Sequence, residues 1–333
     1  MKDERHSLPP HQHQYSYKHS SRLFLFKLFN STVFYVLLLL LSYLLGYLSA
    51  VTRPIVQQLP TRPIVQQLPT RPIVQQLPSS QSSATTKAIF QSLPTQLDNL
   101  HVTTVCAKQL PSELVRETIL DKVYDGTSPF INFPPAHVAT LLRGKSIKGW
   151  GSNGAVFEHL VKKMKPKVII EVGTFLGASA LHMAQLTHKL GLDSVILCID
   201  DFRGWPGFRD RFKFIKMVNG DVLLLYQFMQ NVVAMNATET VLPVPFSSGS
   251  GLQKLCEWGV LGDMIEIDAG HDFNSAWADI NRAYRILRPG GVIFGHDYFS
   301  AADNRGVRRA VNLFGQLNGL KIQTDGQHWV IYS

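Results

Sequence analysis

Short apolar runs alternate with longer amphipathic segments through the second half of the chain. The apolar runs predict strands at residues 167–172, 194–200, 240–245, 263–268 and 291–297. The segments between them predict helices at residues 176–190, 220–235, 251–258 and 272–287. This alternation is typical of an α/β fold with a doubly wound, mostly parallel sheet, in which ligands bind at the carboxyl ends of the strands.

Three shorter amphipathic stretches, at residues 112–123, 135–143 and 153–164, precede the first strand and predict an N-terminal helical extension. Together with the strands and helices that follow, they define a predicted domain at residues 101–333.

The N-terminal part has a different pattern. Residues 33–51 are apolar and uncharged, which is long enough for a helix to cross a bilayer. We therefore expect a retained membrane anchor at residues 31–51, preceded by a basic cytosolic tail at residues 1–30.

Basic residues flank the predicted anchor unevenly. Three of them lie just before it, at residues 18–27, whereas Arg53 and Arg62 follow it, so the positive-inside rule places the N-terminus in the cytosol. The rest of the chain would then face the lumen of the secretory pathway, with the Golgi or endoplasmic reticulum as the expected residence. The sequon that begins at Asn236 would be available for glycosylation.

The sequence TRPIVQQLP occurs three times without change, at residues 52–60, 61–69 and 70–78. Two prolines in each unit prevent a continuous helix, and the unit has too few apolar residues to bury itself. We expect residues 52–100 to be an extended stem and polar linker.

Charge and cysteine content narrow the class of protein. The net charge of +9 is spread over the tail, the stem and the C-terminal part, without an Arg/Lys-rich helix, so a nucleic-acid partner is not expected. The three cysteines, Cys106, Cys198 and Cys256, are too few for a disulfide scaffold and lack the spacing of a zinc site.

The first predicted strand leads into a turn with two glycines, Gly173 and Gly177, spaced Gly-x-x-x-Gly between Glu171 and Ser179. This pattern resembles the first motif of the class I S-adenosylmethionine-dependent methyltransferases, which implies that these four residues bind S-adenosyl-L-methionine. The resemblance covers roughly residues 150–333 and implies a seven-stranded Rossmann-like methyltransferase sheet.

Two further residues are predicted to bind the methyl donor. Asp200 ends the second predicted strand, where a carboxylate can accept both ribose hydroxyls of a nucleoside. Ser248 follows the third strand, with Ser247, at the position where this fold usually lines the adenine.

The ends of the last two predicted strands bring acids and histidines to one rim. Asp268 and His271 follow one strand, and His296 and Asp297 end the next. This segment resembles antibiotic-sugar and cation-dependent O-methyltransferases, which implies that Asp268 and Asp297 bind Mg²⁺ or another divalent cation and that His271 is the base. The cation-dependent catechol type has Asp-Asn at the last position, whereas here Tyr298 follows Asp297, so the role of His296 stays open.

Basic and aromatic side chains alternate in residues 200–217. Such a segment is compatible with a lid that gathers an anionic or aromatic acceptor, and equally with a solvated basic face backed by core aromatics.

These features predict a membrane-anchored, metal-assisted O-methyltransferase acting on a hydroxyl of a glycan or small molecule. The alternatives are a hydroxylase-like enzyme on the same fold and a catalytically degenerate scaffold or binding module. The intact donor motif argues against the scaffold.

Overall fold

The computed structural model describes residues 35–36, 38–45 and 105–333, and the chain divides into two compact units, Met1–Ser80 and Gln81–Ser333. The predicted tail at residues 1–30 and stem at residues 52–100 lie outside the described residues, and so does part of the predicted anchor at residues 31–51.

In the first unit, residues 35–36 and 38–45 are helical, with exposed side chains. None of the helices among the described residues combines the length and the apolar content that a membrane span requires.

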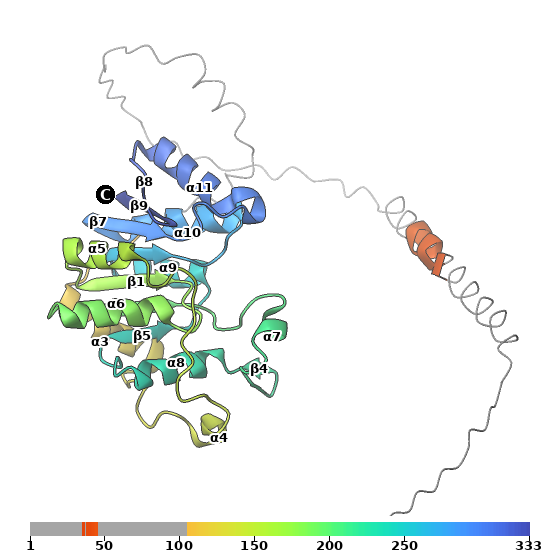
Figure 1. Ribbon diagram of the computed structural model, residues 1–333, viewed down its shortest axis with the longest axis horizontal. Coiled ribbons are helices and arrows are strands. Elements are labelled where there is room, and N and C mark those ends of the chain that lie inside the picture. The colour runs from red at the N-terminus through yellow and green to blue at the C-terminus, as the bar shows by residue number, and fades with distance from the viewer. Residues whose placement is uncertain (1–34, 37, 46–104) are drawn as a thin grey trace, which may run out of the picture. The chain divides into compact units, whose positions relative to one another are not determined.

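In the second unit, a seven-stranded sheet has the order β5-β2-β1-β6-β7-β9-β8 (Figure 1). Its strands are β1 (Val168–Val172), β2 (Val195–Ile199), β5 (Val241–Val244), β6 (Gly262–Ile267), β7 (Leu287–Gly295), β8 (Gln323–Asp325) and β9 (His328–Tyr332). The strands from β5 to β7 are parallel, whereas β9 pairs antiparallel with both β7 and β8. A separate two-stranded ribbon joins β3 (Met217–Val218) to β4 (Asp221–Val222).

Helices cover both faces of the sheet, and each face has its own apolar core. The helices are α3 (Ser112–Tyr124), α4 (Ala136–Ala139), α5 (Ala155–Met164), α6 (Ala178–Lys189), α7 (Phe208–Arg211), α8 (Leu224–Ala234), α9 (Ser248–Glu257), α10 (Phe273–Arg285) and α11 (Ala302–Asn318). One core contains residues of α5, α6 and α8, and the other contains residues of α3, α9, α10 and α11. The sheet is therefore the middle layer of three, as expected for a doubly wound fold.

The five predicted strands are confirmed as β1, β2, β5, β6 and β7, and the four predicted helices between them as α6, α8, α9 and α10. The sheet is mixed rather than all parallel, because the chain returns after α11 through a C-terminal hairpin that pairs with the edge of β7. The helix expected at residues 135–143 is confined to α4, Ala136–Ala139.

A disulfide joins Cys106 to Cys256. Three cysteines are too few for a disulfide scaffold, and this single bond was not predicted. The bond links the segment that enters the domain to the last turn of α9. Backbone hydrogen bonds reinforce this attachment, from Ala107 to the carbonyl of Cys256 and from Leu110 to the carbonyl of Gly259. Cys198 is free and buried.

Candidate active site

The turn after β1 is shaped by its two glycines. Gly173 has φ +88°, and a Cβ atom there would lie 2.2 Å from the carbonyl oxygen of Asp268. Gly177 has φ +80°, and a Cβ atom there would lie 2.8 Å from the ring of Phe228. Only glycine adopts a positive φ without strain and also lacks the Cβ atom that would clash at these two positions. The turn consequently packs directly on the backbone at the end of β6.

The buried side chain of Glu171 stabilises this turn through hydrogen bonds. Its buried carboxylate accepts hydrogen bonds from the hydroxyls of Ser179 and of Thr174, the latter at 2.6 Å, and Cys198 Sγ lies 3.4 Å away. Burial raises the pKa of Glu171 to about 7. The hydrogen bond between Glu171 and Ser179 fixes the turn against the start of α6.

Asp200 lies on the other side of the same turn. Its Oδ2 accepts the backbone N–H groups of Thr174 at 3.1 Å and Phe175 at 2.9 Å, and its Oδ1 accepts that of Phe202 at 2.7 Å. Burial raises the pKa of Asp200, and the backbone hydrogen bonds oppose that rise. The carboxylate therefore connects the ends of β1 and β2.

Ser248 is placed at the start of α9, where Ser247 caps the helix by accepting a hydrogen bond from the backbone N–H of Ser250. The hydroxyl of Ser248 donates to the carboxylate of Asp279 on α10, whose pKa burial raises to about 6. Ser248 is thus linked to Asp279 at the α9–α10 interface.

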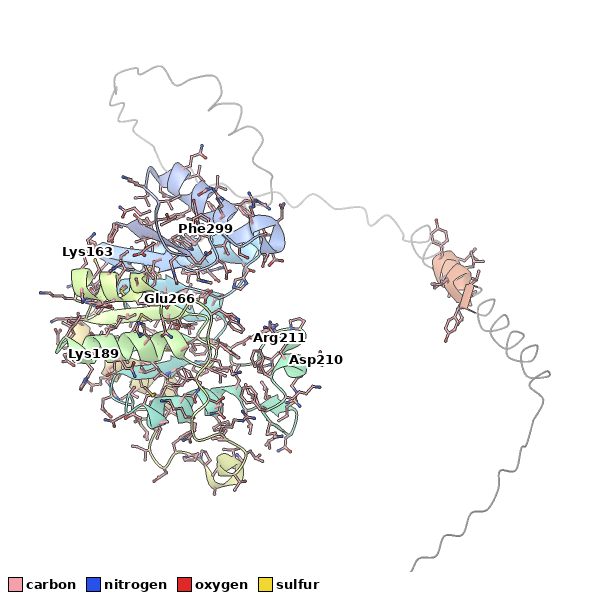
Figure 2. All side chains as sticks on the ribbon, viewed as in Figure 1. Lys163, Lys189, Asp210, Arg211, Glu266 and Phe299 are labelled. Atoms are coloured by element: carbon pink, nitrogen blue, oxygen red, sulfur yellow. A yellow bond between two sulfur atoms is a disulfide. The ribbon has the colours of Figure 1, made fainter. Side chains whose placement is uncertain are left out.

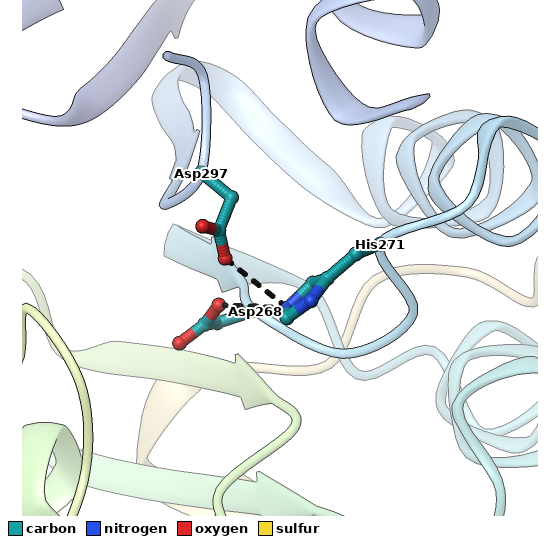
Figure 3. A group of neighbouring side chains, drawn as sticks. All are labelled: Asp268, His271 and Asp297. Carbon is teal, nitrogen blue, oxygen red and sulfur yellow. Dashed lines mark ion pairs between the residues drawn. The ribbon is translucent and has the colours of Figure 1, made fainter. Parts of the chain in front are cut away.

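The acids at the ends of β6 and β7 meet, with an imidazole between them (Figure 3). Nε2 of His271 lies 3.2 Å from Oδ2 of Asp297 and 3.7 Å from Oδ1 of Asp268. Each of the three residues offers a ligand atom, and these atoms all lie within 4.8 Å of one another. The two acids and the histidine predicted from the strand ends therefore form one cluster.

The pKa values of His271 and Asp297 are shifted by the oppositely charged groups beside them. The interaction with Asp268, whose Oδ1 lies 3.7 Å from Nε2, is the main reason why the pKa of His271 is raised, with a further contribution from the charge of Asp297. The pKa of Asp297 is lowered, mainly by its interaction with His296. The two carboxylates thus increase the affinity of the imidazole for a proton.

His296 extends the cluster on its buried side. Its Nδ1 lies 3.3 Å from Oδ2 of Asp297, in a contact without hydrogen-bond geometry. Its ring packs edge-on against His328, with 4.9 Å between the centroids. His296 touches Asp297 but is outside the group of Asp268, His271 and Asp297, whose atoms could together hold a metal ion.

Sequence reasoning missed two residues beside this site, Trp150 and His328. Trp150 stacks on Phe175 of the Gly173–Gly177 turn, with 5.5 Å between ring centroids. It also contacts the rings of Trp205 and Phe212, from the segment that was compatible with a lid. The Gly-rich stretch around Trp150 was a usable signal for a turn near the site, whereas nothing around His328 marks it as a site residue.

The comparisons with known proteins agree with this arrangement. Residues 170–298 match the family model described as "Methyltransferase domain". These residues contain the glycine turn, Asp200 and the acid/histidine cluster. The protein is therefore an enzyme with a methyltransferase domain.

Two solved structures illustrate the similarity. The O-methyltransferase from Bacillus cereus, in complex with SAH, is 19% identical, with a TM-score of 0.41, over 65% of this chain and 96% of that chain. The O-methyltransferase TomG from Streptomyces achromogenes, involved in tomaymycin synthesis and in complex with SAM, is 15% identical, with a TM-score of 0.39, over 56% of this chain and 80% of that chain. No curated protein sequence matches the chain.

Proposed function

We propose that the protein transfers a methyl group from S-adenosyl-L-methionine to an acceptor hydroxyl, with the help of a divalent cation. The observation that carries this proposal is the contact between the Gly173 turn and the backbone of Asp268. That contact puts the region that would hold the donor beside the two carboxylates and the imidazole.

The donor would lie across the carboxyl ends of β1 and β2. The Gly173–Gly177 turn lets a ligand approach the backbone, and α6 begins directly after it, with its free N–H groups facing the same edge. Glu171 and Ser179 hold the shape of the turn. Oδ2 of Asp200 already accepts two backbone N–H groups, whereas Oδ1 accepts one and keeps a lone pair that can accept a ribose hydroxyl.

The cation would be held by Asp268 and Asp297. Two carboxylates whose oxygens converge on one side of the sheet edge fit a Mg²⁺- or Mn²⁺-like ion, and side chains that are about one-fifth exposed leave room for waters and substrate. A bound cation would supply Lewis-acid chemistry, making a coordinated acceptor hydroxyl more acidic.

His271 would receive the proton from that hydroxyl. Its imidazole faces both carboxylates, which stabilise the protonated form once the proton has been transferred. Its side chain is 44% exposed, so the ring is accessible to an acceptor from solvent.

We place the catalytic domain in the lumen of the secretory pathway, tethered by a single anchor at residues 31–51. The disulfide supports this location, because such bonds persist in oxidising compartments. Asn236 is exposed in a turn after α8, where an oligosaccharide could be attached.

Calorimetry with S-adenosylhomocysteine tests the donor site. We expect the full-length protein to bind this product and Asp200→Ala to weaken binding by roughly ten- to a hundredfold, the value of a charge-assisted hydrogen bond. Asp201→Ala, at the exposed neighbouring position, is the matched control. Equal affinity in the Asp200 and Asp201 variants would remove Asp200 from the donor site.

A further inference from the structure

A cavity of about 920 Å³ opens beside the acid/histidine cluster. Its walls come from three places: the loop at residues 147–155, the end of α7 at Arg211 and Phe212, and the turn of the C-terminal hairpin at residues 325–328. His296 also lines it. The volume is within the range of pockets that enclose small-molecule ligands.

His296 connects this cavity to the cluster. One edge of its ring contacts Asp297, through Nδ1. The other edge faces Gly151 of the loop, because a Cβ atom on that glycine would lie 2.4 Å from Nε2. His296 therefore joins the wall of the cavity to Asp297, one of the predicted cation ligands.

His328 brings an unpartnered polar group to the same wall. The residue is 3% exposed, and among the described residues its Nε2 has no hydrogen-bond partner. Phe157 and His296 pack against its ring, with centroids 5.4 Å and 4.9 Å away. A buried polar atom without a partner is costly unless a ligand or water supplies one.

Trp150 provides an apolar platform among these polar groups. It is 47% exposed and lines the cavity, while its contact with Phe175 ties it to the donor turn. Ser152, Asn153 and Gln327 also line the cavity. An exposed indole in such a wall suits a sugar ring, because the C–H face of the ring packs on the indole while its hydroxyls reach polar partners.

The charges in the cavity favour an anion. Arg211 and Lys148 both line it, and among the described residues neither forms an ion pair (Figure 2 labels Arg211 on α7). Each instead lies near an aromatic ring, Arg211 at 5.7 Å from Trp150 and Lys148 at 5.5 Å from Phe214. The one acid in the wall, Asp325, is already paired with His159 at 2.7 Å.

We infer that this cavity binds the methyl acceptor and that the acceptor is a saccharide carrying a carboxylate, with its ring on Trp150 and its carboxylate at Arg211 and Lys148. This inference deepens the proposed function, on which it rests, by assigning a substrate class and a binding site.

Calorimetry on the full-length protein in detergent, without methyl donor, tests the inference with two probes. Cellobiouronic acid and cellobiose differ only in the carboxylate. The acid should bind about tenfold or more tightly than the neutral sugar, as expected for a charge-assisted contact. Arg211→Gln should bring the two affinities to within about twofold, whereas Arg203→Gln, on the same segment but outside the cavity wall, should preserve the difference.

Trp150→Ala should weaken both sugars, while Phe299→Ala, which removes a similarly exposed aromatic elsewhere, should weaken neither. Equal affinity for the two sugars, binding of neither, or an unchanged preference in Arg211→Gln would overturn the inference. Titration of S-adenosylhomocysteine into the same samples keeps the proposals distinct. Donor binding without sugar binding rejects the cavity alone, and sugar binding without donor binding rejects the proposed methyl transfer.

Discussion

Nε2 of His271 lies 3.2 Å from Oδ2 of Asp297, although the two residues follow different strands. The parallel pairing of β6 with β7 brings the two strand ends together, and the loop after β6 turns His271 back over the same edge. The imidazole of His271 therefore lies directly beside a carboxylate that would hold the cation. An acceptor hydroxyl bound to that cation would be close enough to give its proton to the imidazole.

Removal of one carboxylate should weaken cation binding. We expect Asp268→Asn to lower the affinity for Mn²⁺ by at least about tenfold, because the amide loses the charge that binds the ion. Electron paramagnetic resonance of free Mn²⁺ measures this change. Asp210→Asn, an exposed acid on α7, is the control and should bind like the wild type. Equal Mn²⁺ affinity in both variants would contradict the assignment.

Removal of the imidazole should affect rate rather than binding. His271→Ala should lower the rate of methyl transfer on the order of a hundred- to ten-thousandfold, the usual contribution of a general base. Its affinities for Mn²⁺ and S-adenosylhomocysteine should stay within about twofold of the wild type, since the other ligands remain. A large loss of Mn²⁺ affinity would instead make His271 a ligand.

The glycine turn should not tolerate a side chain. Gly173→Ala places Cβ against a backbone carbonyl oxygen at positive φ, so we expect lost donor affinity and a free energy of unfolding lower by about 1–3 kcal/mol. Gly290→Ala is the matched control, because that glycine also has positive φ, +75°, but nothing lies within 4 Å of the added atom. Chemical denaturation of both variants distinguishes the steric clash from the cost of a positive φ, which the two variants share. If both variants lose the same free energy of unfolding, the clash at Gly173 makes no contribution.

Reduction should destabilise the domain. The Cys106–Cys256 bond closes a loop across a sequence separation of 150, so we expect its loss to lower the free energy of unfolding by about 2–5 kcal/mol. Urea denaturation with and without dithiothreitol measures the loss. The Cys106→Ser/Cys256→Ser double variant should be as unstable as the reduced protein and unresponsive to dithiothreitol. A wild type that is equally stable in both conditions would exclude the bond from the mature protein.

The buried carboxyl of Asp279 should make stability depend on pH. Its pKa is raised to about 6 in the folded protein, so the folded state binds the proton more tightly than the unfolded state. This contribution is present at pH 4 and is lost as the pH rises through 6. Asp279→Asn should therefore gain stability relative to the wild type across that interval, by up to about 3 kcal/mol. A stability difference that does not change between pH 4 and pH 7.5 would contradict the raised pKa.

The central strands and the cluster could be predicted because local pattern determines them. An apolar run of five or six residues between turn residues is typical of a buried strand, and an acid directly after such a strand lies at the edge of the sheet. The C-terminal hairpin escaped prediction because β8 is short and exposed and gains its order by pairing with β9. The Cys106–Cys256 pairing and the approach of Trp150 and His328 depend on tertiary packing between segments far apart in sequence, which no local pattern encodes.

The most direct test of metal-assisted methyl transfer is incorporation of label from methyl-labelled S-adenosylmethionine into acidic saccharides by the full-length protein, before and after chelation. We expect transfer that stops with chelator, returns when Mn²⁺ is added, and stays on the order of a hundredfold or more lower in His271→Ala. Transfer that continues unchanged in chelator, at a rate that His271→Ala does not alter, would contradict the account and leave Asp268, His271 and Asp297 with a structural role.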